Sequence, residues 1–507
     1  MSSSNRTASV LQYTSIDEIP KIREHLKATY NSGRLLPLEY RKQQLLRLVH
    51  LVEDNHARFE EAFKVDLGRH ALEVTGVELN NTVMDLMHLH DNFETWAKPE
   101  KPGFNLKFGA FGPVIRRVPK GVVLVVGPFN FPLFSTLCFL GGAIVTGNAC
   151  VVKMSELTPN VSATLTELLP RYLDQDLFRV VNGGISETTA VLQLQWDHIV
   201  FTGSAAVGRI IATAAAKHLT PTTLELGALI GAPGWPTVGN TPSLSVDSKL
   251  WTKALNAGQT CTTVNHIFVP YEAQDALVEA FTKVYKEFFP EGPEKAPIST
   301  LVTDVAFKRI KGLSEKTKGE IVCGGQWDEG RRWMAPTILK NVALDDAVME
   351  NELFGPILPI VPVKDFQDAI DWTNSRSHPL AIYAFTDDAE FKEYGKSDSF
   401  LNRGFDNSLP FAILNDTNLQ TIIPGLPFGG VGGSGYGMVK GHYIFDTLSH
   451  MRATCESPWY VDMILGWRFP PYTDAKIKQA AALKPRIPPL NPTWGTTSQV
   501  DRQPWYL

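Results

Sequence analysis

Cys261 stands where a thiol could act as a nucleophile, because it ends the small polar run NAGQTC at 256–261 and a strand-like segment follows over 262–269. A thiol on such a turn is accessible, and neighbouring backbone N–H groups can face an oxyanion that develops beside it. Most free cysteines, however, are inert small apolar side chains. The run therefore suggests covalent catalysis but becomes specific only together with other residues.

Two further polar side chains could complete such a site. Asn130 lies in GPFNFP at 127–132, after an apolar strand, and its amide could donate to an oxyanion. Taken alone, it is more often a turn residue before a helix that begins with proline. Glu225 lies in LELG at 224–227. Such a carboxylate either faces solvent on an edge strand or lies in a pocket where desolvation raises its pKa, and a general base needs the pocket.

Several segments have features of a dinucleotide site. Lys153 and Glu156 follow an apolar strand, where an acidic side chain can accept hydrogen bonds from a ribose. The alternative is a solvated ion pair ahead of a helix. Gly203 and Ser204, with Gly208 beyond them, begin a helix and could face a pyrophosphate, although the segment is not GxGxxG.

Two more segments could contact a ligand. Glu352 and Phe354 precede a rigid Gly-Pro turn, although a lone phenylalanine belongs more often to a core than to the wall of a cofactor site. The segment 427–437 is dense in glycine. That density indicates close approach of the backbone, either to a ligand or to another strand.

The elements that must position these residues alternate between strand and helix from residue 121 onwards. Short apolar, β-branched runs lie at 122–126, 149–152, 178–181, 198–202 and 223–226, with helical patterns between them, including 186–194 and 205–217. This alternation predicts an α/β fold with a doubly wound parallel sheet. Ligands of such sheets bind at the carboxyl ends of the strands.

Other elements flank this region. Helices are expected over 38–64 and 71–97, and 104–119 has the pattern of a hairpin arm. A second α/β region is expected over 228–426, with strands at 264–269, 357–362 and 380–385 and helices at 272–288 and 365–374.

Composition excludes several classes of function. A net charge of −5 gives no electrostatic case for nucleic acid. Five cysteines without a CxxC pair indicate a reducing compartment, so a cytoplasmic location is expected, and no metal site is predicted. The apolar stretch 121–152 is interrupted by glycine and proline and is expected to be buried rather than to span a membrane. The aromatic tail 459–470 is expected to pack against another subunit, with surface contact to a membrane as the alternative.

The motifs, taken in order, resemble those of the aldehyde dehydrogenase superfamily. They are GPFNFP at 127–132, VVKMSE at 151–156, FTGSAAVG at 201–208, LELG at 224–227, NAGQTC at 256–261, ENELFGP at 350–356 and PFGGVGGSGYG at 427–437. The runs FDTLSH at 445–450 and RFPPYTDAK at 468–476 are similar to the class 3 branch, which acts on fatty and aromatic aldehydes. The resemblance covers roughly residues 30 to 476.

The resemblance implies a role for each catalytic residue. Cys261 would attack the aldehyde to form a thiohemiacetal, whose oxyanion the Asn130 amide and the Cys261 N–H would hold. Loss of a hydride would leave a thioester, and water activated by Glu225 would release the carboxylic acid.

The resemblance also implies NAD as the cofactor, with NADP possible. Lys153 and Glu156 would hold the adenosine ribose, Gly203 and Ser204 would lie near the diphosphate, Glu352 would hold the nicotinamide ribose and Phe354 would lie on one side of the nicotinamide. Gly208, Leu226 and Gly227 are also expected to bind the cofactor. An acidic residue at Glu156 favours NAD over NADP.

The family fold implies a division of the chain. A dinucleotide-binding domain is expected over 1–103 and 120–227, a catalytic domain over 228–426, an oligomerisation arm over 104–119 and 427–457, and a C-terminal tail over 458–507. A homodimer is expected, with a small aldehyde as the substrate.

One segment departs from the family pattern. After Glu225 the family has Gly-Gly-Lys and a short strand, whereas this chain has Gly227 followed by ALIGAPGWP, and prolines and glycines make a poor central strand. A deformed strand at 229–238 is therefore expected. The alternative function is a catalytically impaired relative that acts as a binding protein. A third hypothesis, a cofactor-independent thiol esterase, is disfavoured by Lys153 and Glu156.

Overall fold

The structure is a computed structural model, and it describes residues 11–103, 109–227, 231–233, 242–386, 411–484 and 487–488. The chain divides into two compact units. The larger comprises residues 1–96 and 118–450, and the smaller comprises 97–117 and 451–507.

The larger unit contains a six-stranded sheet in the order β16-β6-β5-β2-β3-β4. Its strands are β2 (Val122–Val126), β3 (Ala149–Lys153), β4 (Phe178–Val181), β5 (His198–Gly203), β6 (Thr222–Leu226) and β16 (Gly435–Tyr436). The first five are parallel, and β16 is antiparallel to β6. Strands β2 and β3 are buried throughout, as expected for near-continuous apolar runs covered on both faces. The predicted doubly wound parallel sheet is confirmed.

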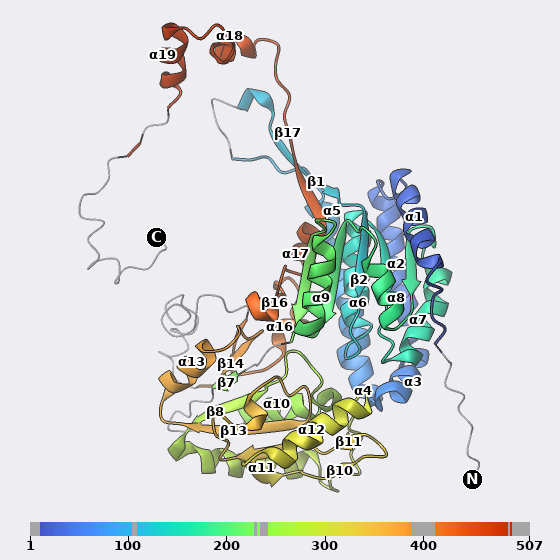
Figure 1. Cartoon of the computed structure of the whole chain (residues 1–507), viewed down its shortest axis with the longest axis vertical. Helices are drawn as coiled ribbons and strands as arrows, with labels where there is room; N and C mark the ends of the chain where they lie inside the picture. Colours follow the sequence, from blue (N-terminus) through green and yellow to red (C-terminus); the bar gives the residue numbers. More distant parts are fainter. Residues whose placement is uncertain are drawn as a thin grey trace. The chain divides into compact units, whose positions relative to one another are not determined.

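Helices cover both faces of this sheet (Figure 1). One face carries α1 (Glu18–Asn31), α8 (Ile185–Leu192) and α9 (Ala205–Ala216), and the other carries α2 (Leu38–Glu53), α3 (His56–Leu67), α5 (Asn80–Trp96), α6 (Phe134–Thr146) and α7 (Pro159–Tyr172). Almost every residue of α6 is buried, because this helix lies between the sheet and the layer of α2 and α5.

The two predicted N-terminal helices differ in detail from the observed ones. The expected helix over 38–64 is interrupted at Asp54 and Asn55, which separate α2 from α3. The expected helix over 71–97 consists of α4 (Ala71–Glu73), a π-helical turn (Val74–Leu79) and α5. π-Helical turns occur frequently at functional sites, and residues of this stretch line the cavity described below.

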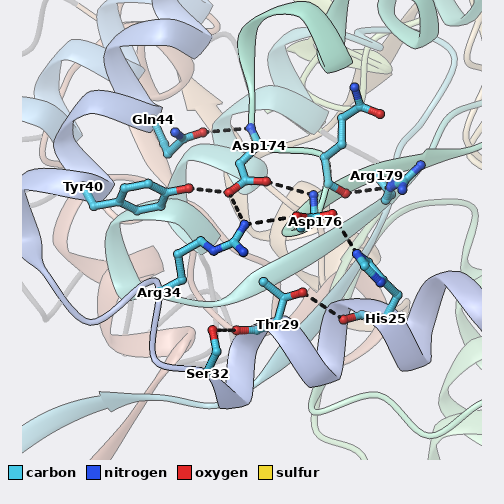
Figure 2. Close-up of polar contacts among 10 residues, drawn as sticks. His25, Thr29, Ser32, Arg34, Tyr40, Gln44, Asp174, Asp176 and Arg179 are labelled. Carbon is cyan, nitrogen blue, oxygen red and sulfur yellow. Dashed lines mark hydrogen bonds and ion pairs between the residues drawn. The ribbon is translucent and has the colours of Figure 1, made fainter.

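A polar cluster ties α1 and α2 to the turn before β4 (Figure 2). Asp174 accepts hydrogen bonds from Arg34 at 2.9 Å and from Tyr40, and Asp176 contacts His25 at 2.8 Å and Arg34 at 3.1 Å. Because His25, Arg34 and Asp176 are exposed and only Asp174 is partly buried, each ion pair contributes little stability by itself. Together they fix the packing of the N-terminal helices at this edge of the sheet.

A second sheet in the larger unit has the order β7-β8-β13-β12-β9. Its strands are β7 (Gly231–Pro233), β8 (His266–Pro270), β13 (Ile357–Val363), β12 (Thr337–Lys340) and β9 (Glu320–Cys323), all parallel except β9. Two apolar clusters pack against it, one including Phe281 of α11 (Gln274–Phe288) and the other including Phe307 of α12 (Asp304–Lys316). The predicted strands and helices of this region are confirmed, apart from small shifts of their ends.

Further helices and strands of the larger unit lie among the described residues. They are α10 (Pro242–Ala254), α13 (Phe366–Asn374), α16 (Leu419–Ile422), α17 (Gly441–Thr447), the hairpin of β10 (Trp327–Asp328) and β11 (Trp333–Met334), and the parallel pair β14 (Ile382–Ala384) and β15 (Ala412–Leu414). Of the segment predicted to be deformed, 229–238, only 231–233 belongs to the described residues, and these form β7 beside β8. The rest of that segment lies outside the described residues.

The smaller unit is built on strand β1 (Val114–Pro119), which pairs with β17 (Ser449–Thr454). Ile115 of β1 also exchanges two backbone hydrogen bonds with Glu100 in antiparallel register, so β1 has one partner nearby in the sequence and another, β17, far along the chain. Residues 104–108 lie outside the described residues. Two helices follow, α18 (Val461–Leu465) and α19 (Asp474–Ala482). Among the described helices, none is long and apolar enough to cross a membrane.

Candidate active site

One cavity of about 1000 Å³ in the larger unit brings the predicted site residues together. It is lined by Asn130, Lys153, Glu156, Gly203, Ser204, Glu225, Leu226, Gly227, Cys261, Glu352 and Phe354. Gly208 does not belong to this lining. A Cβ atom on Gly208 would lie 2.7 Å from Cδ2 of Leu226, so this glycine allows α9 to pack closely on β6.

The parallel sheet explains why residues so distant in sequence meet. Asn130 follows β2, Glu156 follows β3, Ser204 follows β5, and Glu225 lies at the end of β6. These four strands run in the same direction, so their carboxyl ends form one edge of the sheet. The strand order reverses between β2 and β5, and such a reversal opens a crevice where ligands bind.

The turn that carries Cys261 is strained and tightly held. After α10 a 3₁₀ turn (Leu255–Gly258) leads to the cysteine, and Asn256 and Ala257 have φ angles of 49° and 52°. Non-glycine residues in this left-handed region carry a conformational cost that the surroundings must offset. The side chains of Asn256 and Gln259 each donate to the other's backbone carbonyl, at 3.1 and 3.0 Å. These bonds fix the turn.

Direct hydrogen bonds join this turn to the loop of Asn130. Nδ2 of Asn256 donates to the backbone carbonyl of Asn130 at 3.1 Å, and Arg69 donates to the same carbonyl. Arg69 forms an ion pair of 2.8 Å with Glu78, and both side chains are fully buried. Glu78 in turn accepts from the N–H groups of the residues that begin α6. The Asn130 backbone is thus held on two sides, while its side-chain amide has no hydrogen-bond partner among the described residues.

Sequence reasoning did not identify this supporting network. Glu73 accepts from the backbone N–H of Asn256 at 3.2 Å and lies within 3.4 Å of the Ser299 hydroxyl. Charged residues such as Glu73 and Glu78 are ordinary on a helix surface, Arg69 lies in the loop before them, and no spacing shows that the three face inward. Their burial is the only signal, and it requires the structure.

Glu225 is a buried carboxylate without a partner. Its side chain is 5% exposed, and neither carboxylate oxygen has a hydrogen-bond partner among the described residues. Burial raises the pKa of the Glu225 carboxyl well above its ordinary value. Of the two interpretations that the sequence left open, the structure therefore has the carboxylate in a pocket rather than on a solvent-facing edge.

Burial also raises the pKa of the Cys261 thiol to about 12, with Glu352 and Glu225 as the next contributions, while the backbone N–H groups of Cys261 and Thr262 oppose the shift. The thiol is therefore protonated near neutral pH, and its attack on a carbonyl requires a proton acceptor. The N–H groups that favour the thiolate can also donate to an oxyanion that develops beside the sulfur.

The glycine-rich segment 427–437 allows two strands to lie close together. Gly435 of β16 pairs with Glu225 in antiparallel register, and its φ is 125°. A Cβ atom on Gly435 would overlap the backbone carbonyl of Leu224. The glycine therefore lets β16 lie against β6 directly behind the carboxylate.

Another part of the cavity has hydrogen-bond donors and acceptors that suit a dinucleotide. Lys153, nearly buried, forms an ion pair of 2.8 Å with Glu156, which suits the hydroxyl groups of a ribose. Ser204 caps the N-terminus of α9, where backbone N–H groups can face a phosphate. Glu352 lies directly against Gly227, where any Cβ atom would clash with the carboxylate.

A buried lysine, Lys253, accompanies Glu352 and was not singled out from the sequence. Its Nζ lies 3.4 Å from the carbonyl of Gly355, and burial lowers its pKa to about 7. Burial likewise raises the pKa of Glu352 to about 8, opposed by Lys253 and Arg309.

Phe354 has a φ of 45° and makes an edge contact with Phe129 at 5.9 Å between centroids.

Comparison with known proteins decides the family. Residues 3–454 match the model of the aldehyde dehydrogenase family. The chain belongs to the aldehyde dehydrogenase family. It is 38% identical to aldehyde dehydrogenase family 3 member A2 of Rattus norvegicus, over 90% of this chain and 92% of that protein. It is 36% identical to the beta-apo-4'-carotenal oxygenase of Neurospora crassa, over 94% of this chain and 88% of that protein.

A solved structure agrees with this assignment. The substrate-bound AldH of Staphylococcus aureus superposes with a TM-score of 0.85 at 31% identity, covering 92% of this chain and 99% of that one. This aldehyde dehydrogenase is class 3-like, and its activity is the NAD(P)-dependent oxidation of an aldehyde to the carboxylic acid.

Proposed function

We propose that Cys261 is the nucleophile of this oxidation, with Asn130 as the oxyanion donor and Glu225 as the general base. The proposal rests on one observation: a thiol, an unpartnered amide and an unpartnered buried carboxylate line the same cavity. Sγ of Cys261 forms a bond to the aldehyde carbon while the thiol loses its proton to a water molecule, giving a thiohemiacetal with a negatively charged oxygen. The oxyanion then accepts hydrogen bonds from the Asn130 amide and the Cys261 N–H.

NAD(P)⁺, when bound, supplies the hydride acceptor, and we propose that Lys153, Glu156 and Glu352 hold its ribose hydroxyls. Cys261 is left as a thioester. Glu225 takes a proton from a water molecule, which attacks the thioester carbon and releases the acid and the free thiol. Because burial raises the pKa of Glu225, its deprotonated form is a stronger base than an exposed glutamate.

NAD is proposed as the preferred cofactor, because Glu156 would repel the 2′-phosphate of NADP. The ratio of kcat/KM for NAD⁺ and NADP⁺ tests this. Replacement Glu156→Gln removes the repelling charge and is expected to raise kcat/KM for NADP⁺ more than for NAD⁺. An unchanged ratio would contradict this assignment of Glu156.

The substrate is proposed to be a medium- or long-chain aliphatic, aromatic or terpenoid-derived aldehyde. Aromatic side chains that line the cavity, among them Phe131, Phe134 and Phe428, support an apolar substrate. The printed name of the Neurospora crassa relative, which refers to a carotenal, supports the terpenoid option. A panel of aldehydes assayed by NADH appearance, beside Cys261→Ala, tests the activity and the nucleophile together. Turnover that survives in Cys261→Ala would overturn the assignment of the nucleophile.

The domain boundaries expected from the sequence remain the proposal for the whole chain. Residues 1–103 and 120–227 would bind the dinucleotide, 228–426 would form the catalytic domain, and 458–507 the tail. The arm, 104–119 and 427–457, would join two copies in a homodimer, because β1 and β17 form a small two-stranded sheet, and such a sheet can gain strands by pairing with another chain. We also propose a cytoplasmic location. Sedimentation analysis of the full chain tests the dimer, and a monomer at micromolar concentration would contradict it.

A further inference from the structure

A second lysine–carboxylate pair lines the cavity, away from the residues assigned above. Nζ of Lys440 lies 3.4 Å from Oδ1 of Asp85, and their side chains are only 6% and 9% exposed. Both residues line the cavity, as does Cys138, which hydrogen-bonds to Asp85. Removing two charges from water is costly, so a buried ion pair is not explained by stability alone.

The position of Asp85 places the pair on the substrate side of the cavity. Asn81, Asp85 and Leu89 line the cavity from one face of α5, spaced four residues apart, so this wall extends for about 12 Å along the helix. The preceding helical turns lie beside the nucleophile, because Glu73 bonds to the turn of Cys261. A chain extending from Cys261 along α5 would therefore pass Asp85.

Lys440 is held in a strained conformation by specific contacts. Its φ is 77°, which non-glycine residues rarely adopt, and its ammonium donates to the carbonyl of Thr421 at 2.6 Å. Such strain persists only where the surroundings determine the conformation, and it clusters at ligand sites. An ammonium group carries three donors, of which Thr421 and Asp85 take two. Within the described part of the chain the ammonium has no third hydrogen-bond acceptor, only the ring of Phe134 at 6.0 Å, so one donor is available to a ligand in the cavity.

Resting on the proposed aldehyde oxidation, we propose that Lys440 and Asp85 bind a hydroxyl group of the substrate, remote from its aldehyde. A hydroxyl both accepts from the ammonium and donates to the carboxylate, so it satisfies both partners. A carboxylate at this position of the substrate would be repelled by the negative charge of Asp85. A ketone could accept a hydrogen bond from Lys440 but could not donate one to Asp85. Lys153 and Glu156, proposed to hold ribose hydroxyls, form the same kind of pair in the same cavity.

Matched aldehydes test this inference. Straight-chain aldehydes of increasing length are compared with the ω-hydroxy aldehydes of the same length, and the ratio of their kcat/KM values is measured on the full-length enzyme. We expect a maximum at one length, where the hydroxy aldehyde is preferred by about tenfold or more, as a hydrogen bond to a charged group provides. In Lys440→Met the maximum is expected to disappear, whereas Lys440→Arg should keep part of it.

Lys120→Met is the matched control. Lys120 is partly buried, less so than Lys440, and likewise donates to a carbonyl at 2.6 Å, that of Thr447 at the far end of α17; it also contacts His198 and does not line the cavity. The preference should survive in this variant. The ratio of kcat/KM for the hydroxy and plain aldehydes is measured within each protein, so a general loss of activity does not alter it. The wild-type series is informative even if Lys440→Met fails to fold.

The outcomes separate this inference from the proposed function. Oxidation of both series without preference at any length, or a preference that survives in Lys440→Met, would overturn the hydroxyl site and leave the oxidation intact. Failure to oxidise any aldehyde of either series would overturn the proposed function and this inference with it.

Discussion

Asn256 donates its side-chain amide to the backbone carbonyl of Asn130 at 3.1 Å, so the turn of the nucleophile and the loop of the oxyanion donor form one hydrogen-bonded unit. Asn130 lies in the loop after β2 of the six-stranded sheet and Asn256 in the turn before β8 of the five-stranded sheet, 126 positions apart in the sequence. The relative placement of the sulfur and the amide is therefore fixed by a direct bond rather than by the packing of the two sheets alone. Small misplacements of reacting groups are costly in rate.

Replacement of Asn256 by alanine is expected to lower kcat by about 10- to 100-fold, because it releases this bond and the one to Gln259. Leaving the buried acceptors unpaired should also reduce the free energy of unfolding by about 1–3 kcal/mol. Steady-state kinetics and thermal unfolding measure both effects. Asn55→Ala is the control, since Asn55 also donates two hydrogen bonds, to Leu51 and Tyr172, far from the cavity. An equal loss of kcat in both variants would contradict a positioning role for Asn256.

Replacement of Asn130 by alanine is expected to reduce kcat by about 10²–10³-fold, the usual effect of removing one oxyanion donor. The bonds that Arg69 and Asn256 make to Asn130 involve its backbone carbonyl and are retained, so the fold should change little. Kinetics combined with a thermal melt distinguishes the two effects. A variant with unaltered kcat would exclude the Asn130 amide as the oxyanion donor.

Replacement of Glu225 by glutamine is expected to abolish turnover and to stabilise the fold at alkaline pH. Burial raises the pKa of the folded carboxyl, so between its ordinary pKa and this raised value the folded state binds a proton that the unfolded state has released. The free energy of unfolding of the wild type must therefore fall as pH rises through this window, by about 1.4 kcal/mol for each pH unit that the window spans. Glutamine removes the effect.

Thermal unfolding measured from about pH 4 to pH 9 tests this sign. The melting temperatures of wild type and Glu225→Gln should be similar at the acid end and diverge in favour of the variant towards the alkaline end. Exposed Glu279→Gln serves as the control and should show no such divergence. A variant that is less stable than the wild type at alkaline pH would mean that the Glu225 carboxylate has a stabilising partner.

Much of the fold could be predicted from the sequence, because β2, β3, β5 and β6 are short apolar runs separated by helical patterns. The residues at their carboxyl ends could be predicted to meet, since parallel strands share one edge. The site residues could be predicted from the order of the family motifs, which include both Asn130 and Cys261.

Other features depend on long-range packing and leave no local trace. Arg69 and Glu78 face inward on elements whose charges are ordinary for a surface, and the partner strand of β1 lies at the other end of the chain. The glycines near Gly435 could serve a ligand or a strand, and only the pairing with β6 decides between them. Whether Glu225 lies in a pocket or on an exposed edge also depends on β16, because this strand pairs with β6 and covers its edge.

The covalent role of Cys261 is tested most directly by intact-protein mass spectrometry of Glu225→Gln mixed with NAD⁺ and an aldehyde substrate. Because this variant lacks the base that activates water, the acyl group should accumulate on the enzyme as one adduct, and peptide mapping should locate it on Cys261. Glu225→Gln combined with Cys261→Ala should show no adduct. An acyl group found on another residue, or wild-type turnover retained after loss of Cys261, would contradict the account.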